Sequence, residues 1–502
     1  KLTMKKEYMK LFFAGMLSSF PFSFIPFPPI TIIGFYIFFK ELSVSTCLKN
    51  SVILAFFFGF GHNLFGMHWI FFPLTFDANL MYLAPIIPII FASFFALFIC
   101  FSSLFVHFII KKTLLMRHIY LSSVLIAIFF YTGEFLRSKL FGGFPWNLYG
   151  HIWSFSENFL GIVKYIGIFG LSFLTILWIV LVSQKILLKQ FKDTVILLLI
   201  FPAFLLFTGI SNEEKTSGSI KVRVVQPNIP QDKKWSREHM KYNMNKLIKL
   251  SFKEKGSPSL IIWPEVAVPE FLNKSKGTIE YLSKLLPKET YLLLGSLRIE
   301  DKEIFNSSYL LSNKGIIDHY DKLKLVPFGE FIPFRDFFSF KKLTEGKRDF
   351  SVGVNRKIMP IKVKKSILKI EPSICYEGIF PQKRINNLES NVLINITNDA
   401  WFGTTTGPSQ HLTATRFRSI ERGLPLIRVA NSGISAIYNG SGKLLDSIPL
   451  NQEGYIDFDL KISHLDTIYS NYGDKTFIVM FLIVLFLAIF LDFFSIKKRL
   501  NN

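Results

Sequence analysis

The chain has 502 residues, of which 50% are hydrophobic and 57 are phenylalanine, and its mean hydropathy is +0.36. A composition this apolar excludes a wholly soluble protein and predicts at least one membrane-embedded domain. The net charge of +22 does not indicate nucleic acid binding, because the basic residues are dispersed along the chain instead of forming one basic face.

Eight apolar stretches are candidates to cross a bilayer, which requires about 20 residues of helix. The first two are short and are separated by prolines around Pro28, so we expect them to form a tight helical hairpin. All but the last lie in the first part of the chain. The stretches are 11–25, 27–39, 51–72, 83–110, 119–137, 160–183, 194–210 and 476–494.

The loops between these stretches alternate in their content of basic residues. Cytoplasmic loops are enriched in lysine and arginine, and such residues precede the first stretch, recur in every second loop and follow the last one from Lys497 to Arg499. The pattern predicts that both chain ends are cytoplasmic. Residues 1–210 would then form a membrane bundle, 211–475 a domain outside the cytoplasm, and 476–502 a closing span with a cytoplasmic tail.

Residues 211–475 differ in character from the rest of the chain. Short runs of apolar and β-branched residues alternate here with helical stretches, which is typical of a layered α/β domain. The predicted strands are 220–226, 259–263, 291–296, 366–374, 391–397 and 424–430, and the predicted helices are 232–253, 277–286 and 408–422.

One cysteine of this outer domain has no other cysteine near it. Cys47 falls in a predicted cytoplasmic loop and Cys100 in a membrane stretch, which leaves Cys375 in SICYEGIFP (373–381) as a lone thiol. An isolated cysteine is most often a buried and inert side chain. The end of a strand is also where α/β domains place catalytic groups, so a nucleophilic role stays open.

Two further segments bring charged groups to strand ends or turns. Glu265 in WPEVAVPE (263–270) follows an apolar strand, and a carboxylate in such surroundings is suited to act as a general base. In YDKLKLVPFGEFIP (320–333), Lys322 and Glu330 flank a turn rich in proline and glycine. Each of these residues alone is compatible with an ordinary loop position.

The order of these groups along the chain resembles the Glu-Lys-Cys triad of the nitrilase superfamily. The resemblance implies an αββα sandwich, with Glu265 as general base, Lys322 as the cation that stabilises the oxyanion, and Cys375 as nucleophile. Lys322 is preferred to Lys324 because it stands eight residues before Glu330, the spacing that the resemblance implies.

The whole chain is similar to the apolipoprotein N-acyltransferase family, in its seven spans, outer nitrilase-like domain and closing span. This resemblance implies that Trp235, Glu330, Tyr376 and Glu377 line or brace the site. We also expect Asn398 to support the site, and its role there would be to stabilise a turn, because asparagine and aspartate favour turns. The motifs behind the resemblance are GEFLRSKLFGGFPWNLYG (133–150), WPEVAVPE (263–270), LVPFGEFIP (325–333), CYEG (375–378), NITNDAWFG (395–403) and QHLTATRFRSIERGLPLIRVANSGISA (410–436).

The resemblance also implies a reaction and a location. An acyl chain would move from a phospholipid, through a thioester on the cysteine, to the α-amino group of the diacylglyceryl-modified N-terminal cysteine of an apolipoprotein. The enzyme would be a monomer in the bacterial inner membrane. We expect no cofactor and no metal, because no His/Cys/Asp cluster in the outer domain has metal-ligand spacing and no glycine-rich phosphate loop is present. His411 is accordingly expected to be a helix-face residue.

Two other functions stay open from the sequence alone. A membrane-tethered amidase or nitrilase would use the same triad to hydrolyse C–N bonds, and an inactive lipid-binding or transport scaffold would not use it at all. The spans carry few charges, with Glu134 as the one acid noted, which argues against a transporter. The aromatic segment 331–340 is expected either to dip into the membrane interface or to pack on the core of its own domain.

Overall fold

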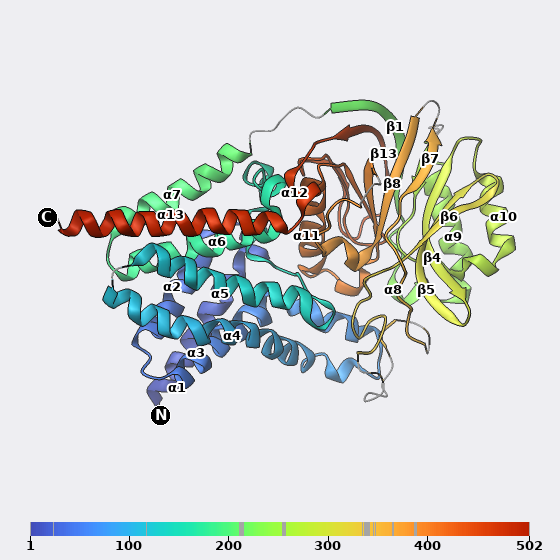
Figure 1. Ribbon diagram of the computed structural model, residues 1–502. Coiled ribbons are helices and arrows are strands. Elements are labelled where there is room, and N and C mark those ends of the chain that lie inside the picture. Colours follow the sequence, from blue (N-terminus) through green and yellow to red (C-terminus); the bar gives the residue numbers. More distant parts are fainter. Residues whose placement is uncertain are drawn as a thin grey trace. The chain divides into compact units, whose positions relative to one another are not determined.

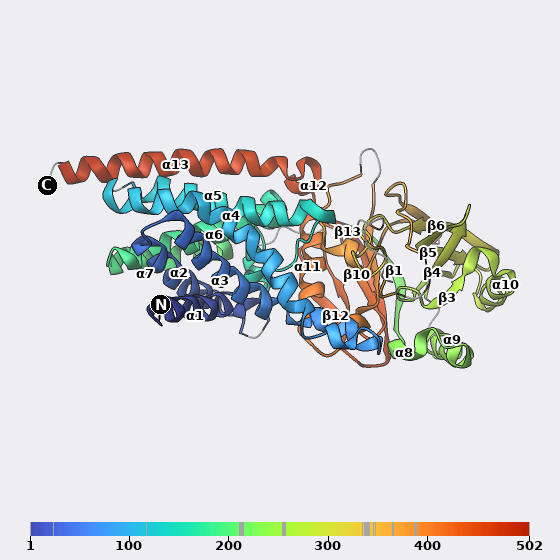
Figure 2. The same ribbon diagram turned by 90° about the horizontal axis from the view of Figure 1, so that it is seen from below.

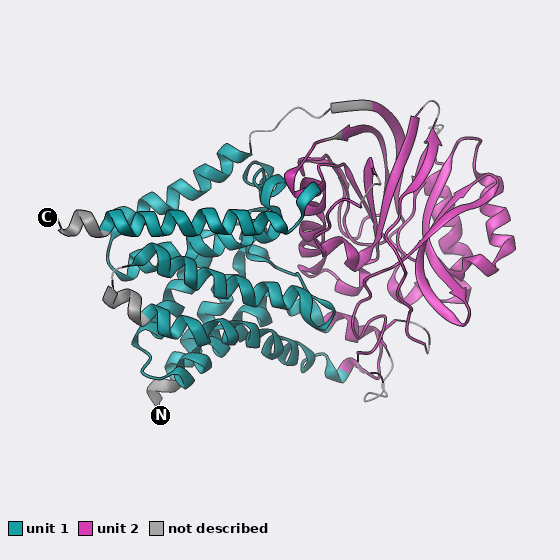
Figure 3. Cartoon of the chain, in the orientation of Figure 1, with its two compact units in different colours: residues 1–71, 82–211, 471–502 teal, residues 72–81, 212–470 magenta. Residues whose placement is uncertain are grey.

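The computed structural model shows two compact units in the chain (Figure 3). The first unit consists of Lys1–Phe71, Tyr82–Ser211 and Asn471–Asn502, and the second of Phe72–Met81 and Asn212–Ser470. The structure describes residues 2–23, 25–116, 118–209, 215–253, 258–333, 335, 342–344, 346, 348–363, 366–385 and 389–500.

The first unit is a bundle of apolar helices. In both views α5, α6 and α13 run side by side (Figure 1, Figure 2), and α6 is buried over most of its length. The helices are α1 (Leu2–Ser19), α2 (Pro29–Val44), α3 (Leu48–Gly66), α4 (Ile87–Met116), α5 (Ile119–Lys139), α6 (Val163–Leu187), α7 (Phe191–Thr208) and α13 (Lys475–Leu500).

Fewer of these helices qualify as membrane spans than the sequence predicted. Among the described residues, α4, α5, α6, α7 and α13 are long and apolar enough to cross a membrane. Helix α3 and the short helix η2 (His68–Phe76) would form a sixth span, bent by 51°. The two predicted N-terminal spans are helical, but α2 has only 16 residues and the first half of α1 carries several charges.

Small residues and buried polar contacts hold the first unit together. A Cβ on Gly15 of α1 would lie 2.0 Å from the carbonyl oxygen of Phe58 on α3, and such close approach through small residues is usual between membrane helices. Glu134 on α5 accepts a hydrogen bond from the Tyr149 amide at 2.8 Å. It is not the only acid in a predicted span, because Asp492 on α13 accepts the Leu121 amide at 2.8 Å and so caps the start of α5.

The second unit contains two mixed sheets. The first has the order β13-β1-β2-β4-β5-β6, with β3 paired to β4, and the second has the order β12-β11-β10-β9-β8-β7. The strands are β1 (Lys215–Gln226), β2 (Leu260–Ile262), β3 (Val268–Phe271), β4 (Tyr291–Glu300), β5 (Glu303–Ser312), β6 (Gly315–Asp321), β7 (Met359–Val363), β8 (Ser366–Ile374), β9 (Val392–Thr397), β10 (Leu426–Ala430), β11 (Ser435–Tyr438), β12 (Leu444–Ile448) and β13 (Gly454–His464).

Helices cover the outer faces of both sheets. Helices α9 (Arg237–Ser251) and α10 (Lys276–Leu285) pack their apolar faces on the seven-stranded sheet, and both views place them on the same side of it (Figure 1, Figure 2). Helix α11 (Gly407–Arg422) contributes Leu412 to the cluster on the outer face of the other sheet. The order helix, sheet, sheet, helix confirms the predicted fold class.

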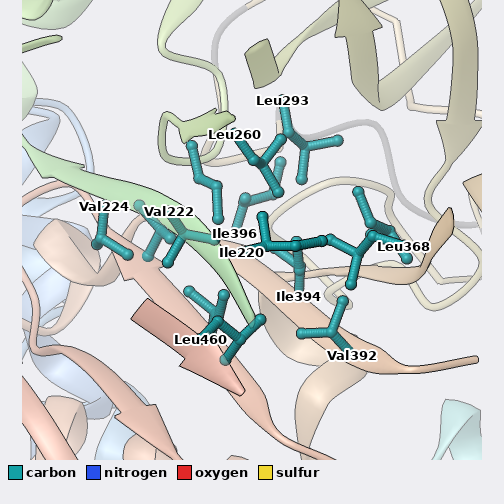
Figure 4. Packing of buried hydrophobic residues seen from close by; sticks show 14 of the residues in the cluster. Ile220, Val222, Val224, Leu260, Leu293, Leu368, Val392, Ile394, Ile396 and Leu460 are labelled. Carbon is teal, nitrogen blue, oxygen red and sulfur yellow. The ribbon is translucent and has the colours of Figure 1, made fainter. Parts of the chain in front are cut away.

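The inner faces of the two sheets form the largest apolar core of the second unit. Figure 4 shows Val222 and Leu260 from the first sheet packed against Ile394 and Ile396 from the second. All six predicted strands are present, because each is an apolar run that enters this core or the layers outside it. The predicted helix 232–253 is instead two helices, α8 (Gln231–Lys234) and α9, interrupted at Trp235.

Parallel pairing determines where the predicted site residues lie. Strands β1, β2 and β4 run parallel in the first sheet, and β8, β9 and β10 run parallel in the second. Glu265 follows the carboxyl end of β2, and Cys375 follows that of β8. Because Ile374 and Cys375 belong to the same core cluster as Ile262, these two strand ends meet across the sandwich.

A single core substitution tests this packing. Ile394 on β9 is fully buried, whereas Ile367 on the neighbouring β8 is 57% exposed. We expect Ile394→Ala to lower the free energy of unfolding by about 2 to 5 kcal/mol, because it leaves a cavity between the sheets. Ile367→Ala should change it by less than about 0.5 kcal/mol. Urea denaturation of the full chain in detergent, followed by tryptophan fluorescence, measures both, and equal losses would contradict the sandwich core.

Candidate active site

Glu265 lies in a tight turn at the end of β2. Strand β4 passes directly beneath it, and a Cβ on Gly295 would lie 2.7 Å from the Glu265 Cα and 2.4 Å from the Val266 amide nitrogen. Only glycine therefore fits under the turn. Val266 has φ of 45°, which is strained for a β-branched residue. The packing of β4 against the turn fixes the direction in which Glu265 leaves the strand.

A buried ammonium joins two carboxylates beside this turn. Lys322, which follows β6, is 1% exposed, and its Nζ lies 2.9 Å from Glu330 Oε1 and 3.4 Å from Glu265 Oε1. The Asn306 side chain on β5 donates to the same two oxygens, at 3.0 Å and 2.8 Å respectively. The Glu265 carboxylate makes both of these contacts, with Lys322 and Asn306, through Oε1.

A second lysine, which sequence reasoning did not identify, contributes to the same cluster. Lys234 is buried, and its Nζ donates to the backbone carbonyl of Glu265 at 2.9 Å. Burial lowers the pKa of Lys234 to about 8, against the opposing effect of the Glu265 and Cys375 charges. Buried charges are tolerated when they are paired, and two carboxylates here face two amines. The only sequence signal was its position next to Trp235.

Cys375 occupies the turn between β8 and the short helix η8 (Cys375–Ile379). Its φ is 51°, a left-handed conformation that is uncommon for a residue with a side chain. Its carbonyl oxygen accepts from Asn395 Nδ2 at 3.3 Å and lies 3.3 Å from His411 Nε2. The thiol thus stands on a strained turn whose backbone is held from two other elements, and such strain is common at functional sites.

The electrostatics of the cluster keep the thiol protonated at rest. Burial and the Glu265 carboxylate raise the pKa of Cys375 to about 12, and the charge of Lys322 offsets this only in part. Burial opposes the charged form of Lys322, but Glu330 and Glu265 outweigh it and raise its pKa above the ordinary lysine value. The site therefore holds a neutral thiol and a permanent cation, so the thiol requires a base to become a nucleophile.

Glu377 connects the cysteine turn to the lysine segment. Its Oε2 accepts from the Ile374 amide at 2.7 Å, and its Oε1 accepts from the Tyr320 hydroxyl at 2.9 Å and from the Lys324 amide at 3.2 Å. One carboxylate therefore fixes the backbone before Cys375 relative to the backbone around the lysine. Burial raises the pKa of Glu377, although these hydrogen bonds oppose the shift.

The other predicted supporting residues lie around this cluster in different roles. Tyr376 is buried with its ring edge-on to Phe380. Trp235 packs on an apolar cluster that includes Val266, next to Glu265. The Asn398 side chain forms hydrogen bonds with Gln231 and Asn431 instead of with the charged cluster. These bonds stabilise the turn in which Asn398 lies. Lys324 is exposed, with its Nζ 5.5 Å from the Phe380 ring centre.

A buried polar network behind Cys375 was not identified as part of the site from the sequence. Arg428 on β10 and Asp399 form an ion pair of 2.7 Å in which both side chains are fully buried. Arg428 also donates to Asn395 Oδ1 at 2.7 Å, and Asp399 Oδ1 lies 2.9 Å from His411 Nδ1. His411 is therefore more than a helix-face residue. Burial opposes ionisation of Asp399, but the charges of Arg428 and His411 hold its pKa well below its usual range.

Part of the predicted aromatic segment 331–340 lies outside the described residues, which include only Phe331–Pro333 and Arg335 of it. Ile332 is buried, and Phe331 packs on the same apolar cluster as Trp235. Within the described part of the chain, no group of three His, Cys, Asp or Glu residues is arranged to hold a metal ion.

Comparison with protein families matches both halves of the chain. Residues 221–468 match the carbon-nitrogen hydrolase family. Residues 14–181 match the N-terminal domain of apolipoprotein N-acyltransferases. The first match contains every charged residue of the cluster described above.

Curated relatives match nearly the full length. The apolipoprotein N-acyltransferase of Rickettsia bellii (strain RML369-C) is 37% identical over 477 residues, covering 90% of this chain and 91% of that protein. The enzyme of the same name from Rhodopseudomonas palustris (strain ATCC BAA-98 / CGA009) is 32% identical over 510 residues, covering 95% and 93%.

Solved structures match the second half of the chain at low identity. A CN-hydrolase superfamily protein from Xanthomonas campestris is 17% identical, with a TM-score of 0.36, and the match covers 49% of this chain and 91% of that chain. An amidase from Nesterenkonia sp. is 14% identical, with a TM-score of 0.37 and coverage of 53% and 97%.

The raised pKa of Cys375 predicts how the resting thiol reacts. Only the thiolate is alkylated. The rate constant for iodoacetamide should therefore rise about tenfold per pH unit between about pH 7 and about pH 10, without a plateau, because the pKa of Cys375 is about 12. Peptide mapping by mass spectrometry measures it, with the exposed Cys47 as the internal control. A plateau near neutral pH would show that the thiol is already ionised at rest.

Proposed function

Because the chain belongs to the apolipoprotein N-acyltransferase family, we propose that it transfers a fatty acyl chain from a phospholipid to the N-terminal amine of diacylglyceryl-modified apolipoproteins, in two half-reactions through a thioester on Cys375. The observation that carries this proposal is the buried cluster of Glu265, Lys322 and Glu330 beside a protonated, strained cysteine. We propose Glu265, Lys322 and Cys375 as its catalytic residues.

The first half-reaction acylates the enzyme. Glu265 takes the thiol proton as the sulfur of Cys375 attacks the ester carbonyl of the phospholipid, and a tetrahedral oxyanion forms. Lys322 stabilises the oxyanion, a role that its permanent charge supports. The intermediate then expels the lysophospholipid oxygen, which takes the proton back from Glu265, and the thioester remains.

The second half-reaction moves the acyl chain to the amine. The α-amino group of the acceptor attacks the thioester carbonyl, and its pKa of about 8 means that part of it is already neutral at working pH. Glu265 removes the second proton from the attacking nitrogen. The thiolate leaves and is reprotonated, so the amide product and the resting enzyme form together.

The membrane unit supports lipid substrates. Both donor and acceptor are lipids, so the reaction requires a protein that reaches the bilayer surface, and five helices of the described chain are apolar and long enough to cross it. A single helix would suffice as a tether. We propose a monomer in the bacterial inner membrane, with both chain ends cytoplasmic and the second unit outside.

The same cluster would also serve a hydrolase, in which water replaces the amine as acceptor. The two alternatives share the thioester and differ only in what removes the acyl chain. Burial of the thiol and of the charged cluster, where Cys375 is 8% exposed, favours an acceptor delivered to the site over bulk water. An inactive scaffold would have no need of two buried carboxylates around one lysine, which are costly to bury.

The thioester gives the direct test of the proposal. After incubation of the full chain with phosphatidylethanolamine vesicles, intact-protein mass spectrometry should show an adduct of one fatty acyl group that hydroxylamine removes. Cys375→Ala should abolish the adduct, since it removes the nucleophile, and Cys47→Ser should retain it because that thiol is not part of the site.

Addition of an acceptor then separates transfer from hydrolysis. A synthetic diacylglyceryl-cysteinyl peptide should discharge the adduct and gain the acyl chain as a hydroxylamine-stable amide. Release of free fatty acid at the same rate with and without the peptide would favour the hydrolase. An adduct on another residue, or turnover with no adduct, would contradict the proposal.

A pair of glutamates in one motif tests the general base. We expect Glu265→Gln to slow acyl-enzyme formation by about 10² to 10⁴-fold, the usual loss when a positioned base is removed. Glu270 stands in the same motif, but its carboxylate accepts from the Thr278 hydroxyl at 3.0 Å and is not part of the cluster, so Glu270→Gln should leave the rate near that of the wild type. Rapid-quench measurement of the adduct gives both rates, and equal rates for the two variants would exclude Glu265 as the base.

A further inference from the structure

We propose that His411 positions the nucleophile, by donating a hydrogen bond from its Nε2 to the carbonyl of Cys375. The inference rests on the proposed function, in which Cys375 forms the thioester. His411 is buried on α11, and its Nε2 lies 3.3 Å from the Cys375 carbonyl oxygen. Both ring nitrogens contact protein groups, Nδ1 those of Asp399 and Arg428 and Nε2 the Cys375 carbonyl, so the ring acts through the cysteine backbone and not on the substrate.

The groups around the His411 ring require a proton on Nε2, whether the imidazole is neutral or protonated. The Cys375 carbonyl can only accept, so Nε2 must donate. Nδ1 lies 3.0 Å from Arg428 NH2, which only donates, and 2.9 Å from Asp399 Oδ1, which accepts. A neutral ring accepts from the arginine and an imidazolium donates to the aspartate. In both states Nε2–H points at the cysteine carbonyl.

This hydrogen bond acts on the strained part of the chain. Cys375 is a non-glycine residue with φ of 51°, and a residue with a side chain keeps this conformation only when its surroundings hold it there. The direction of a carbonyl defines ψ of its own residue, and φ and ψ together set where the side chain points. His411 and Asn395 hold the Cys375 carbonyl from α11 and β9, and so fix the direction of the sulfur.

The donors are themselves held in place. Arg428 donates to Asn395 Oδ1 at 2.7 Å, which turns the amide nitrogen of Asn395 toward Cys375. Arg428 and Asp399 together hold His411 at Nδ1, and the ring of Phe402 packs edge-on against it at 5.7 Å. A histidine that only filled the core would not need to donate a hydrogen bond to the carbonyl of Cys375, the residue with the strained backbone.

The test compares two substitutions at one position with a control at a residue that donates a hydrogen bond to the same helix. His411→Phe keeps a ring against Phe402 but removes the donor, whereas His411→Gln places an amide donor near the position of Nε2. Thr467→Val removes another buried hydrogen bond to α11, the bond from its hydroxyl to the Glu421 carbonyl at 2.6 Å, without contact to Cys375. Should His411→Phe not fold, His411→Asn replaces it, because its shorter amide does not reach the carbonyl.

Two acyl donors are tested with the full chain. Phosphatidylethanolamine vesicles probe the proposed reaction, and p-nitrophenyl butyrate probes the nucleophile independently of lipid recognition. We expect His411→Phe to slow thioester formation from both donors by about 10 to 100-fold, the range for a misplaced reacting group. The half-saturating phospholipid concentration should not change. His411→Gln should recover most of the rate, and Thr467→Val should match the wild type.

Any other result contradicts either the positioning role of His411 or the proposed function. A wild-type rate in His411→Phe, equal losses in His411→Phe and His411→Gln, or an equal loss in Thr467→Val would overturn the positioning role. If the wild type reacts with p-nitrophenyl butyrate but not with phospholipid, the proposed function fails, and the order of the variants with the ester still decides the role of His411. If it reacts with neither, both inferences fall.

Discussion

The buried ammonium of Lys322 is the group on which the second unit depends. It lies within 3.4 Å of Glu265 and 2.9 Å of Glu330, and a charge this deep is tolerated only when its partners are in place. Those partners come from segments that follow β2 and β6, with Asn306 of β5 between them. Correct pairing of the first sheet is therefore a condition for satisfying the charges, and the charges in turn favour that pairing.

The same cluster accounts for a thiol that is protonated at rest and that would be deprotonated only during the proposed reaction. Burial, together with the nearby Glu265 carboxylate, raises the pKa of the Cys375 thiol to about 12, so the sulfur carries no charge at rest. In the proposed mechanism, negative charge moves from the Glu265 carboxylate to the oxyanion beside Lys322 when the sulfur attacks, and the total charge of the cluster does not change. A preorganised site of this kind needs little rearrangement during the reaction. Lys234 donates to the Glu265 carbonyl and so holds the proposed base at the end of its strand.

The sequence predicted the features that depend on a local residue pattern, such as the apolar strands. It did not predict the contacts that depend on how the strands pair. The six apolar strands were predictable because a buried strand reads as an unbroken apolar run. Strands β5 and β6 were not, since they carry inward polar residues such as Asn306 whose partners lie in other segments. Lys322 and Lys324 are equivalent by composition, and only the fold makes one buried and the other exposed. His411 and Arg428 are far from Cys375 in sequence, so their contacts follow from the parallel order of β8, β9 and β10.

The backbone strain at this site could not be predicted from any sequence pattern. Val266, Phe328 and Cys375 all have positive φ. Val266 directly follows Glu265, Phe328 stands two residues before Glu330, and Cys375 is the proposed nucleophile. Glycine would adopt these conformations at no steric cost, yet none of the three is glycine. The proposed chemistry requires a sulfur at Cys375, so glycine cannot replace it, and Asn395 and His411 contact its carbonyl. At Val266 the side chain packs with Leu297 and Leu325, and this apolar contact offsets the strained turn that presents Glu265. The nucleophile and the proposed base thus stand on turns that the surrounding structure, and not their own conformational preference, keeps in place.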